Sequence, residues 1–165
     1  QTGQYWEDIY MVRKLQGTVL HSQDAWLLIR GMRTLFLRVE RACKNAMAIA
    51  THFDGHPHIE KVLYPGLPSD PGHEVAKRQT DGQFGGMMSI IIKGSEKTAI
   101  DVTRFCELFY PATSLGGVES LVEHRKTVSG DGFPVHPRLL RLSIGIEEAD
   151  DLIYDLEQAL ARACV

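Results

Sequence analysis

Two segments in the last third of the chain carry residues that could bind a carboxylate. One is a turn rich in small residues, which contains Thr113 and Ser114 and continues into a pair of glycines. The other is the apolar run 139–146, which carries a single arginine, Arg141. The guanidinium of arginine presents a planar fork of N–H donors that matches the two oxygens of a carboxylate. An apolar strand with one guanidinium, placed beside a small-residue turn, would make a clamp for an acidic group.

An ordinary structural explanation exists for each of these residues. Arginine is often exposed at the surface of a strand, and serine and glycine are frequent in turns. However, Ser143 and Gly145 share the strand face of Arg141 and are small, so they would leave space beside the guanidinium. This space favours a ligand-binding role for Arg141.

Two other groups of residues suggest different chemistry. Glu119 and Glu147 could act as paired carboxylates in acid–base catalysis. A structural role is the better explanation, since Glu147 begins the predicted closing helix, where the N-terminal end favours a negative charge. The cluster His52, His56 and His58 could bind zinc, but glycine and proline interrupt the helix between the histidines and no cysteine is near. We therefore expect no metal ion.

The spacing of apolar residues predicts an α+β domain, with helices first and strands alternating with helices afterwards. Gly17 is expected to end the first helix, and Ser22 and Ser95 are expected to cap two others. The connections leave parallel and antiparallel strand orders open. The helices are predicted over residues 7–16, 23–34, 37–53, 73–79, 96–109 and 148–163, and the strands over 59–64, 87–92 and 139–146.

The composition indicates a folded globular chain without a surface for nucleic acid or membrane. The 165 residues are 44% hydrophobic and 24% charged, and the formal net charge is −3. This composition allows a substantial core, and the basic residues are interspersed with acidic ones rather than gathered in a stripe. The longest apolar run, 25–29, is too short to span a bilayer, and residues 1–4 lack the charged and apolar regions of a signal peptide.

The cysteines indicate a reducing compartment. Cys43, Cys106 and Cys164 are far apart in the sequence, and no C-x-x-C pair is present. Cys43 and Cys106 lie among apolar residues on predicted helices, so we expect buried, reduced thiols there. The cytoplasm is therefore the expected location.

Several segments occur in the order and spacing of one enzyme family. They are DAWLLIRGMRTL at 24–35, VLYPGLPS at 62–69, AKRQ at 76–79, FGGMMS at 84–89 and SLGGVESL at 114–121. Together they resemble the C-terminal part of the pyridoxal-phosphate (PLP)-dependent enzymes of cysteine and methionine metabolism. That family includes cystathionine γ-synthases, cystathionine lyases and methionine γ-lyases. The resemblance extends from about residue 17 to residue 160.

The resemblance implies a particular fold and domain organisation. The chain would form the small C-terminal domain of a fold type I PLP-dependent transferase, in which helices cover a small β-sheet preceded by a long linking helix. Residues 1–36 would supply the linking helices from the absent cofactor domain. Residues 37–165 would form the α+β substrate-binding domain.

The resemblance also implies roles for the residues of the clamp. Arg141 matches the arginine that holds the substrate α-carboxylate, and Ser114 matches a serine that positions the substrate beside the Schiff-base lysine. Thr113 falls at a position that helps to select the substrate side chain. A threonine there differs from the acidic residue of many cystathionine γ-lyases and from the aromatic residue of some β-lyases. The choice between elimination and replacement, at the β- or γ-carbon, therefore stays open, with a weak preference for a cystathionine γ-synthase.

The cofactor implied by the resemblance is PLP, bound in the complete enzyme through a lysine that follows a Ser-x-Thr pattern. No lysine of this chain follows that pattern. We therefore expect no cofactor-binding residue here, and neither tight PLP binding nor activity from the chain alone. The expected partners are a sulfur amino acid or activated homoserine ester, a missing N-terminal cofactor domain, and further copies in a homo-oligomer, which is a tetramer in the family.

Two alternatives to this interpretation remain. The chain could be a regulatory or interaction module that retained the fold and lost the chemistry, as the lack of a suitable lysine would suggest. It could also be an incomplete product or a proteolytic fragment of a working enzyme. The retention of Thr113, Ser114 and Arg141 opposes the first alternative, because a scaffold does not need a carboxylate clamp.

Overall fold

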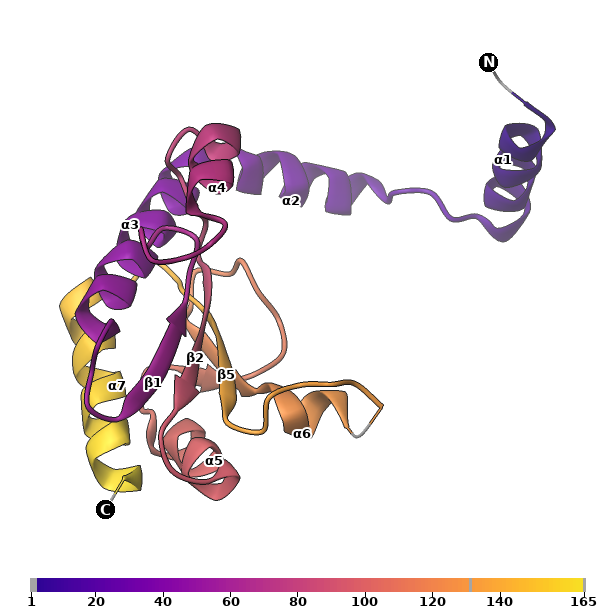
Figure 1. Cartoon of the computed structure of the whole chain (residues 1–165). Helices are drawn as coiled ribbons and strands as arrows, with labels where there is room; N and C mark the ends of the chain where they lie inside the picture. The colour runs from indigo at the N-terminus through magenta and orange to yellow at the C-terminus, as the bar shows by residue number, and fades with distance from the viewer. Residues whose placement is uncertain (1–2, 131, 165) are drawn as a thin grey trace. The chain divides into compact units, whose positions relative to one another are not determined.

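The computed structural model of the chain describes residues 3–130 and 132–164. Its backbone divides into two compact units, Gln1–Phe36 and Leu37–Val165. The first unit contains helices α1 (Gln4–Gln16) and α2 (Ser22–Met32), and α3 (Leu35–Phe53) begins at the boundary and lies mostly in the second (Figure 1). All strands of the described residues belong to the second unit.

The first unit consists of two capped helices. As predicted, α1 ends at Gln16, and Gly17 follows in the left-handed conformation with a φ of 65°. The prediction that Ser22 caps the next helix is wrong, because the cap is His21, whose Nδ1 accepts a hydrogen bond from the backbone N–H of Gln23. Neither α1 nor α2 contains a buried residue.

A five-stranded sheet organises the second unit, with the strand order β1-β2-β5-β4-β3. All neighbouring pairs are antiparallel except β3 and β4, which are parallel. Strand β5 therefore lies at the centre of the sheet. The strands are β1 (Ile59–Leu63), β2 (Met87–Ile92), β3 (Tyr110–Pro111), β4 (Leu121–His124) and β5 (Leu139–Ser143).

Two of these strands were not predicted from the sequence. Strand β4 is buried along its whole length, so its side chains show no alternation of polar and apolar residues. Strand β3 is only two residues long. The predicted strand at 139–146 ends at Ser143, three residues earlier than expected.

The core lies between the sheet and helices α3 and α7 (Ala149–Ala163) (Figure 1). Leu140 and Leu142 of β5 are fully buried in it, as the alternation of the sequence predicts. Helices α4 (His73–Thr80), α5 (Glu96–Phe105) and α6 (Arg125–Ser129) complete the unit, and α6 was not predicted. Ser95 caps α5 as expected, because its Oγ accepts a hydrogen bond from the backbone N–H of Thr98. The fold is the small α+β domain that the sequence predicts.

Helix α5 ends at Phe105 and not at residue 109 as predicted. The carboxylate of Asp155, on α7, accepts hydrogen bonds from the backbone N–H groups of Glu107, Leu108 and Phe109 at 2.7, 2.9 and 3.0 Å. These groups would otherwise need partners within a longer helix. The buried carboxylate therefore sets the point at which the chain leaves the helix.

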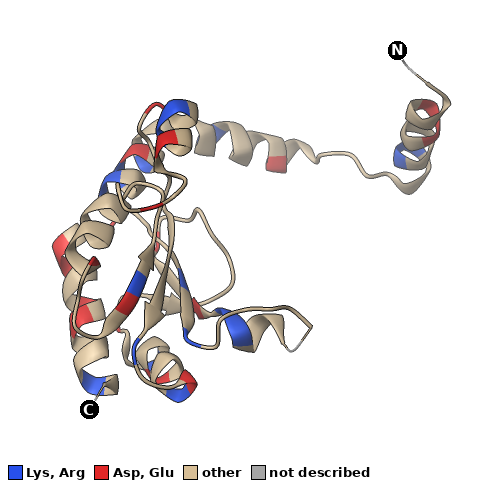
Figure 2. Ribbon diagram, in the orientation of Figure 1, with Lys and Arg blue, Asp and Glu red and all other residues tan. Residues whose placement is uncertain are grey.

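The cysteines and charges bear on the expected environment of the chain. All three cysteines are unpaired, and Cys43 is buried. Cys106 follows the end of α5, and burial together with the nearby charge of Asp155 raises the pKa of its thiol to about 12. Figure 2 shows acidic and basic residues spread over the second unit without a continuous run of one sign. Within the described residues, no helix combines the length and the apolar character needed to cross a membrane.

Candidate functional site

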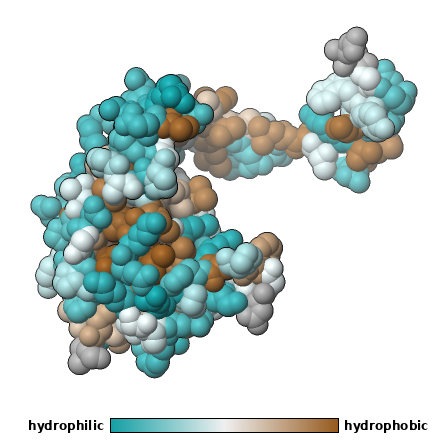
Figure 3. All heavy atoms as spheres, in the orientation of Figure 1, coloured by the Kyte–Doolittle hydropathy of each residue, from teal (hydrophilic) through white to brown (hydrophobic). Residues whose placement is uncertain are grey.

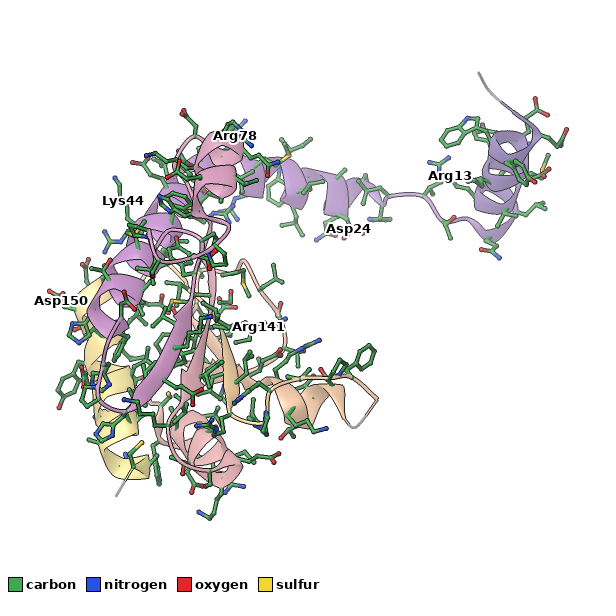
Figure 4. All side chains as sticks on the ribbon, in the orientation of Figure 1. Arg13, Asp24, Lys44, Arg78, Arg141 and Asp150 are labelled. Carbon is green, nitrogen blue, oxygen red and sulfur yellow. The ribbon has the colours of Figure 1, made fainter. Side chains whose placement is uncertain are left out.

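The central position of β5 places Arg141 between two neighbouring strands. Ser89 of β2 and Glu123 of β4 lie directly opposite Arg141 in the strand registers. The side chain of Arg141 points away from the face of the sheet that carries the buried leucines of β5, and it is 22% exposed (Figure 4). This face of the sheet is where the small-residue turn lies.

The guanidinium of Arg141 contacts the turn that contains Thr113 and Ser114. Its Nη2 donates hydrogen bonds to the carbonyl oxygens of both residues, at 3.2 Å in the case of Ser114. Its Nε lies 3.1 Å from Oε1 of Glu123. The structure thus brings together the three residues that the sequence singles out. Their roles in binding stay predictions.

Glu123 is the residue of this site that the sequence analysis missed. Its side chain is 3% exposed, and its Oε1 also lies 2.9 Å from Nη1 of Arg125. No hydrogen-bond partner for its Oε2 is found in the described part of the chain. The available signal was an acidic residue directly after the apolar pair Leu121 and Val122, since a charge that becomes buried requires a partner.

The small residues next to Arg141 make room for the turn itself. The Oγ of Ser143 accepts a hydrogen bond from the backbone N–H of Gly116 at 3.1 Å. A Cβ atom added to Gly145 would lie 2.2 Å from the carbonyl oxygen of Val118. The sequence analysis had expected space for a ligand here, and that expectation is wrong because the backbone of residues 116–119 fills the space.

Glu147 fastens the end of this turn to the end of β5. Its carboxylate accepts hydrogen bonds from the backbone N–H of Ser120 at 2.6 Å and from Ser120 Oγ at 2.9 Å. Ser120 Oγ in turn accepts a hydrogen bond from the backbone N–H of Gly145 at 2.9 Å. Glu147 therefore has a structural role, as expected. Helix α7 begins two residues after it, at Ala149, with Glu148 as the N-cap residue.

Helix α3 fixes the same segment from the other side. Asn45 is 3% exposed, and its Nδ2 donates hydrogen bonds to the carbonyl oxygens of Gly145 and Glu147 at 3.1 and 2.8 Å. Arg41 donates to the carbonyl of Glu147 and pairs with Glu148 at 2.8 Å. The turn, the end of β5 and α3 are thus joined by buried and partly buried hydrogen bonds, which preorganise the surroundings of Arg141.

The histidine cluster forms a link between α3 and α7. Nε2 of His52 lies 2.7 Å from Oε1 of Glu157, and Nε2 of His56 lies 3.3 Å from Oε2 of the same residue. Burial by itself raises the pKa of Glu157, but the hydrogen bond from His52 and the charges of both histidines outweigh it and lower the pKa. Residues 3–130 and 132–164 contain no group of three or more side chains arranged to hold a metal ion.

The lysines show whether the chain could hold PLP, which requires a lysine for a Schiff base beside a site for the ring and phosphate. All lysines except Lys126 are exposed, and Lys44 and Lys97 pair with acidic residues one helical turn away. The carboxylate-binding role of Arg141 and the location of the cofactor lysine outside this chain stay predictions.

Comparison with known proteins identifies the family. Residues 1–161 match the family described as Cys/Met metabolism PLP-dependent enzyme, so the chain belongs to that family. The cystathionine gamma-synthase of Mycobacterium bovis is 45% identical over 159 residues, which cover 93% of this chain and 41% of the relative. The chain thus spans less than half the length of this relative.

Solved structures give the same result for the fold. The crystal structure of cystathionine gamma-lyase from yeast matches with a TM-score of 0.87 at 37% identity, over 97% of this chain and 43% of the other. Cystathionine gamma-synthase from Xanthomonas oryzae pv. oryzae, in complex with aminoacrylate and cysteine, matches with a TM-score of 0.79 at 42% identity, over 85% and 38%. The predicted family and fold class are therefore confirmed.

Proposed function

We propose that this chain supplies the substrate-carboxylate-binding part of a PLP-dependent transsulfuration enzyme. The enzyme would carry out elimination or replacement at the β- or γ-carbon of a sulfur amino acid or an activated homoserine ester. Arg141 would anchor the α-carboxylate, Ser114 would position the reacting end, and Thr113 would shape the side-chain pocket. The observation that carries this proposal is the contact of the Arg141 guanidinium with the turn at residues 113–114.

The hydrogen bonds of Arg141 determine how it would receive a carboxylate. Nε is directed at Glu123 and Nη2 at two carbonyl oxygens, and Nη1 has no partner among the residues that the structure describes. A carboxylate would bind Nη1 first and could then replace a carbonyl oxygen at Nη2, which completes a bidentate contact. Hydrogen bonds to a charged group of this kind contribute about 1.5–3 kcal/mol each.

Thr113 is suited to select the substrate side chain. It lines a mainly apolar cavity of about 200 Å³, together with Glu123 and residues of α5, β3, β4 and α6. The cavity thus adjoins two residues that contact the guanidinium. An amino acid held at Arg141 could direct its side chain into this cavity, where a threonine would exclude less volume than an aromatic residue. The 45% identity to a cystathionine gamma-synthase favours a γ-synthase over a lyase.

The cofactor and its lysine are assigned to residues outside this chain, so the chain alone would be inactive. Its first partner would be a cofactor domain, which would cover the exposed apolar side chains of α1 and α2, among them Trp6, Ile9, Trp26 and Ile29. The same surface would promote assembly of several copies. The unpaired cysteines support a reducing compartment such as the cytoplasm.

A regulatory or interaction module is the second candidate. The lack of a lysine that follows the Ser-x-Thr pattern in this chain favours it. Adding PLP to the chain and recording the absorbance tests whether a lysine of this chain forms a Schiff base with the cofactor. We expect no yellow lysine adduct, and such an adduct with turnover would overturn the assignment of the cofactor to residues elsewhere.

A titration with L-cystathionine, followed by NMR, tests the carboxylate site. In the unmodified chain we expect shifts of the amide signals of Thr113 and Ser114. Arg141→Met should weaken binding by about tenfold or more, because a charge-assisted hydrogen bond is lost. Arg104→Met is the matched control, since Arg104 is exposed on α5 and pairs with Asp101. Equal affinities for the Arg141→Met variant and the unmodified chain would contradict the proposal and favour the module.

A further inference from the structure

Glu123 and Arg141 form a cross-strand pair in the middle of the sheet. The register of β4 and β5 sets the two residues opposite each other, and Oε1 of Glu123 lies 3.1 Å from Nε of Arg141. The carboxylate is almost completely buried, whereas the arginine is partly exposed. A buried carboxylate of this kind interacts strongly with its few partners, because little water screens it.

The contacts of Arg141 define the plane of its guanidinium. All five N–H groups of a guanidinium lie in one rigid plane. Glu123 holds the Nε end, and the carbonyl oxygens of Thr113 and Ser114 hold Nη2. Two fixed points on a rigid plane leave Nη1 in a defined direction. Without Glu123, only the Nη2 contacts would remain, and the group could rotate about them.

A second arginine competes for the same oxygen. Nη1 of Arg125 lies 2.9 Å from Oε1 of Glu123, the oxygen that also faces Arg141. Arg125 begins the short helix α6 and keeps 39% of its side-chain exposure, so it is held less firmly than Glu123. The two guanidinium groups thus share one carboxylate oxygen. Because they repel each other and compete for the same acceptor, each weakens the other's contact with Glu123.

We propose that Glu123 is a positioning residue, which orients the guanidinium of Arg141 for a planar carboxylate, and that Arg125 limits this hold by competing for the same oxygen. The inference rests on the proposed carboxylate site. It adds that the orientation of Arg141 is set by a neighbouring strand and not by the turn alone. Glu123 itself does not need to touch the ligand.

A positioning role can be separated from a purely electrostatic one. The negative charge of Glu123 would weaken the binding of any anion to Arg141, so its removal would strengthen acetate and chloride alike. Loss of orientation would affect acetate only, because a spherical chloride ion has no preferred plane. The ratio of the acetate and chloride affinities therefore reports on positioning, and the common change reports on charge.

The first experiment follows the Arg141 Nε–H signal by NMR in the full chain, with Arg141→Lys used to assign the signal. We expect Glu123→Ala to speed up hydrogen exchange of this group by about tenfold or more, because a charge-assisted hydrogen bond protects it. Glu123→Gln keeps an acceptor oxygen, so its exchange rate should lie between that of the unmodified chain and that of Glu123→Ala. Glu119→Gln, a change at an exposed residue of the turn, is the control and should leave the signal unchanged. An Nε–H signal that Glu123→Ala does not alter would overturn the inference.

Arg125→Met provides a test that does not depend on replacing a buried residue. Removing the competing cation should slow the exchange of the Arg141 Nε–H, which is the opposite of the effect of Glu123→Ala. Faster or unchanged exchange in Arg125→Met would contradict the proposed competition. This variant keeps the buried carboxylate and its cross-strand pair, so the sheet should remain intact.

The second experiment measures acetate and chloride affinities by titration of the same signal. We expect the preference for acetate over chloride to fall in Glu123→Ala and to be partly restored in Glu123→Gln. An unchanged preference would show that Glu123 acts only through its charge and would overturn the inference. If the unmodified chain shows no preference for acetate, the proposed carboxylate site fails, while the exchange data still decide whether Glu123 orients Arg141.

Discussion

The two units of the chain differ in how far their apolar residues are buried. Helices α1 and α2 of the first unit bury no side chain. Even the large apolar side chains of Trp6 and Trp26 each remain 60% exposed. In the second unit, the apolar residues of α3, α7 and the sheet form one continuous core. Figure 3 shows the hydrophobic surface of α2. Local signals are enough to end and cap the helices of the first unit, but burial requires a partner.

The comparison extends to the polar residues. In the second unit, polar side chains hold three loops at fixed positions. The buried carboxylate of Asp155 binds the loop after α5, the partly buried carboxylate of Glu147 binds the turn, and the buried amide of Asn45 binds the end of β5. In the first unit, by contrast, side-chain hydrogen bonds such as that of Gln4 with Asp8 are exposed. The second unit therefore owes its definite loop geometry to desolvated polar groups, and substitutions there should have the larger effects.

The largest loss of stability is expected for Asp155→Ala. Three backbone N–H groups would lose their acceptor in a buried region, which should cost about 3–5 kcal/mol. Urea unfolding monitored by circular dichroism measures this change. Asp151→Ala on the exposed side of α7 is the control, with an expected change below about 0.5 kcal/mol. Similar values for both variants would mean that the carboxylate of Asp155 does not hold the loop.

Gly145→Ala should have the next largest effect. Its methyl group would meet the carbonyl oxygen of Val118, and forcing the turn away should cost about 1–3 kcal/mol. Chemical shifts of Thr113 and Ser114 should change at the same time. Gly31→Ala in the first unit is the matched control, because nothing lies within 4 Å of its added Cβ. A destabilisation by Gly31→Ala as large as that of Gly145→Ala would remove the contrast between the units.

A smaller, pH-dependent effect is expected for Glu157. Because the two histidines lower the pKa of its carboxyl in the folded chain, Glu157 stabilises the fold above the ordinary value of 4.5. That contribution is lost as the pH falls below 4.5 and through the lowered pKa. The group is partly exposed, so we expect less than about 1 kcal/mol. Unfolding of Glu157→Gln at pH 3 and pH 6 should show no such loss, with Asp151→Asn as the control.

The smallest change in unfolding free energy is expected from deletion of residues 1–34. The second unit keeps its core without them, so residues 35–165 should unfold at nearly the same urea concentration as the full chain. Binding of a hydrophobic dye and self-association should both fall, because the exposed side chains of α1 and α2 are gone. Loss of cooperative unfolding after the deletion would show that the second unit depends on the first.

Short-range signals account for most of what could be predicted. The C-terminal end of α1, both ends of β2, the cap at Ser95 and the buried face of β5 follow from glycine, serine and alternating apolar residues in the sequence, whereas α1 begins at Gln4, three residues before its predicted start. Strand β4 could not be found in this way, because all four of its residues are buried. The early end of α5 was also hidden, since its cause is the carboxylate of Asp155, which lies 46 residues beyond Phe109 in the chain.

At the candidate site, too, some features follow from local sequence and others only from long-range contacts. The residue types of Thr113, Ser114 and Arg141 pointed to a carboxylate clamp, and the order of the motifs pointed to the family. Only the folded sheet places Glu123 opposite Arg141 and fills the space beside Gly145 with the backbone of the turn. The sequence by itself determined most of the helices, the strand that carries Arg141 and the arginine itself, because these depend on neighbours along the chain. The tertiary structure decided which donors of that arginine are engaged, because its partners come from other strands and are selected by register and desolvation.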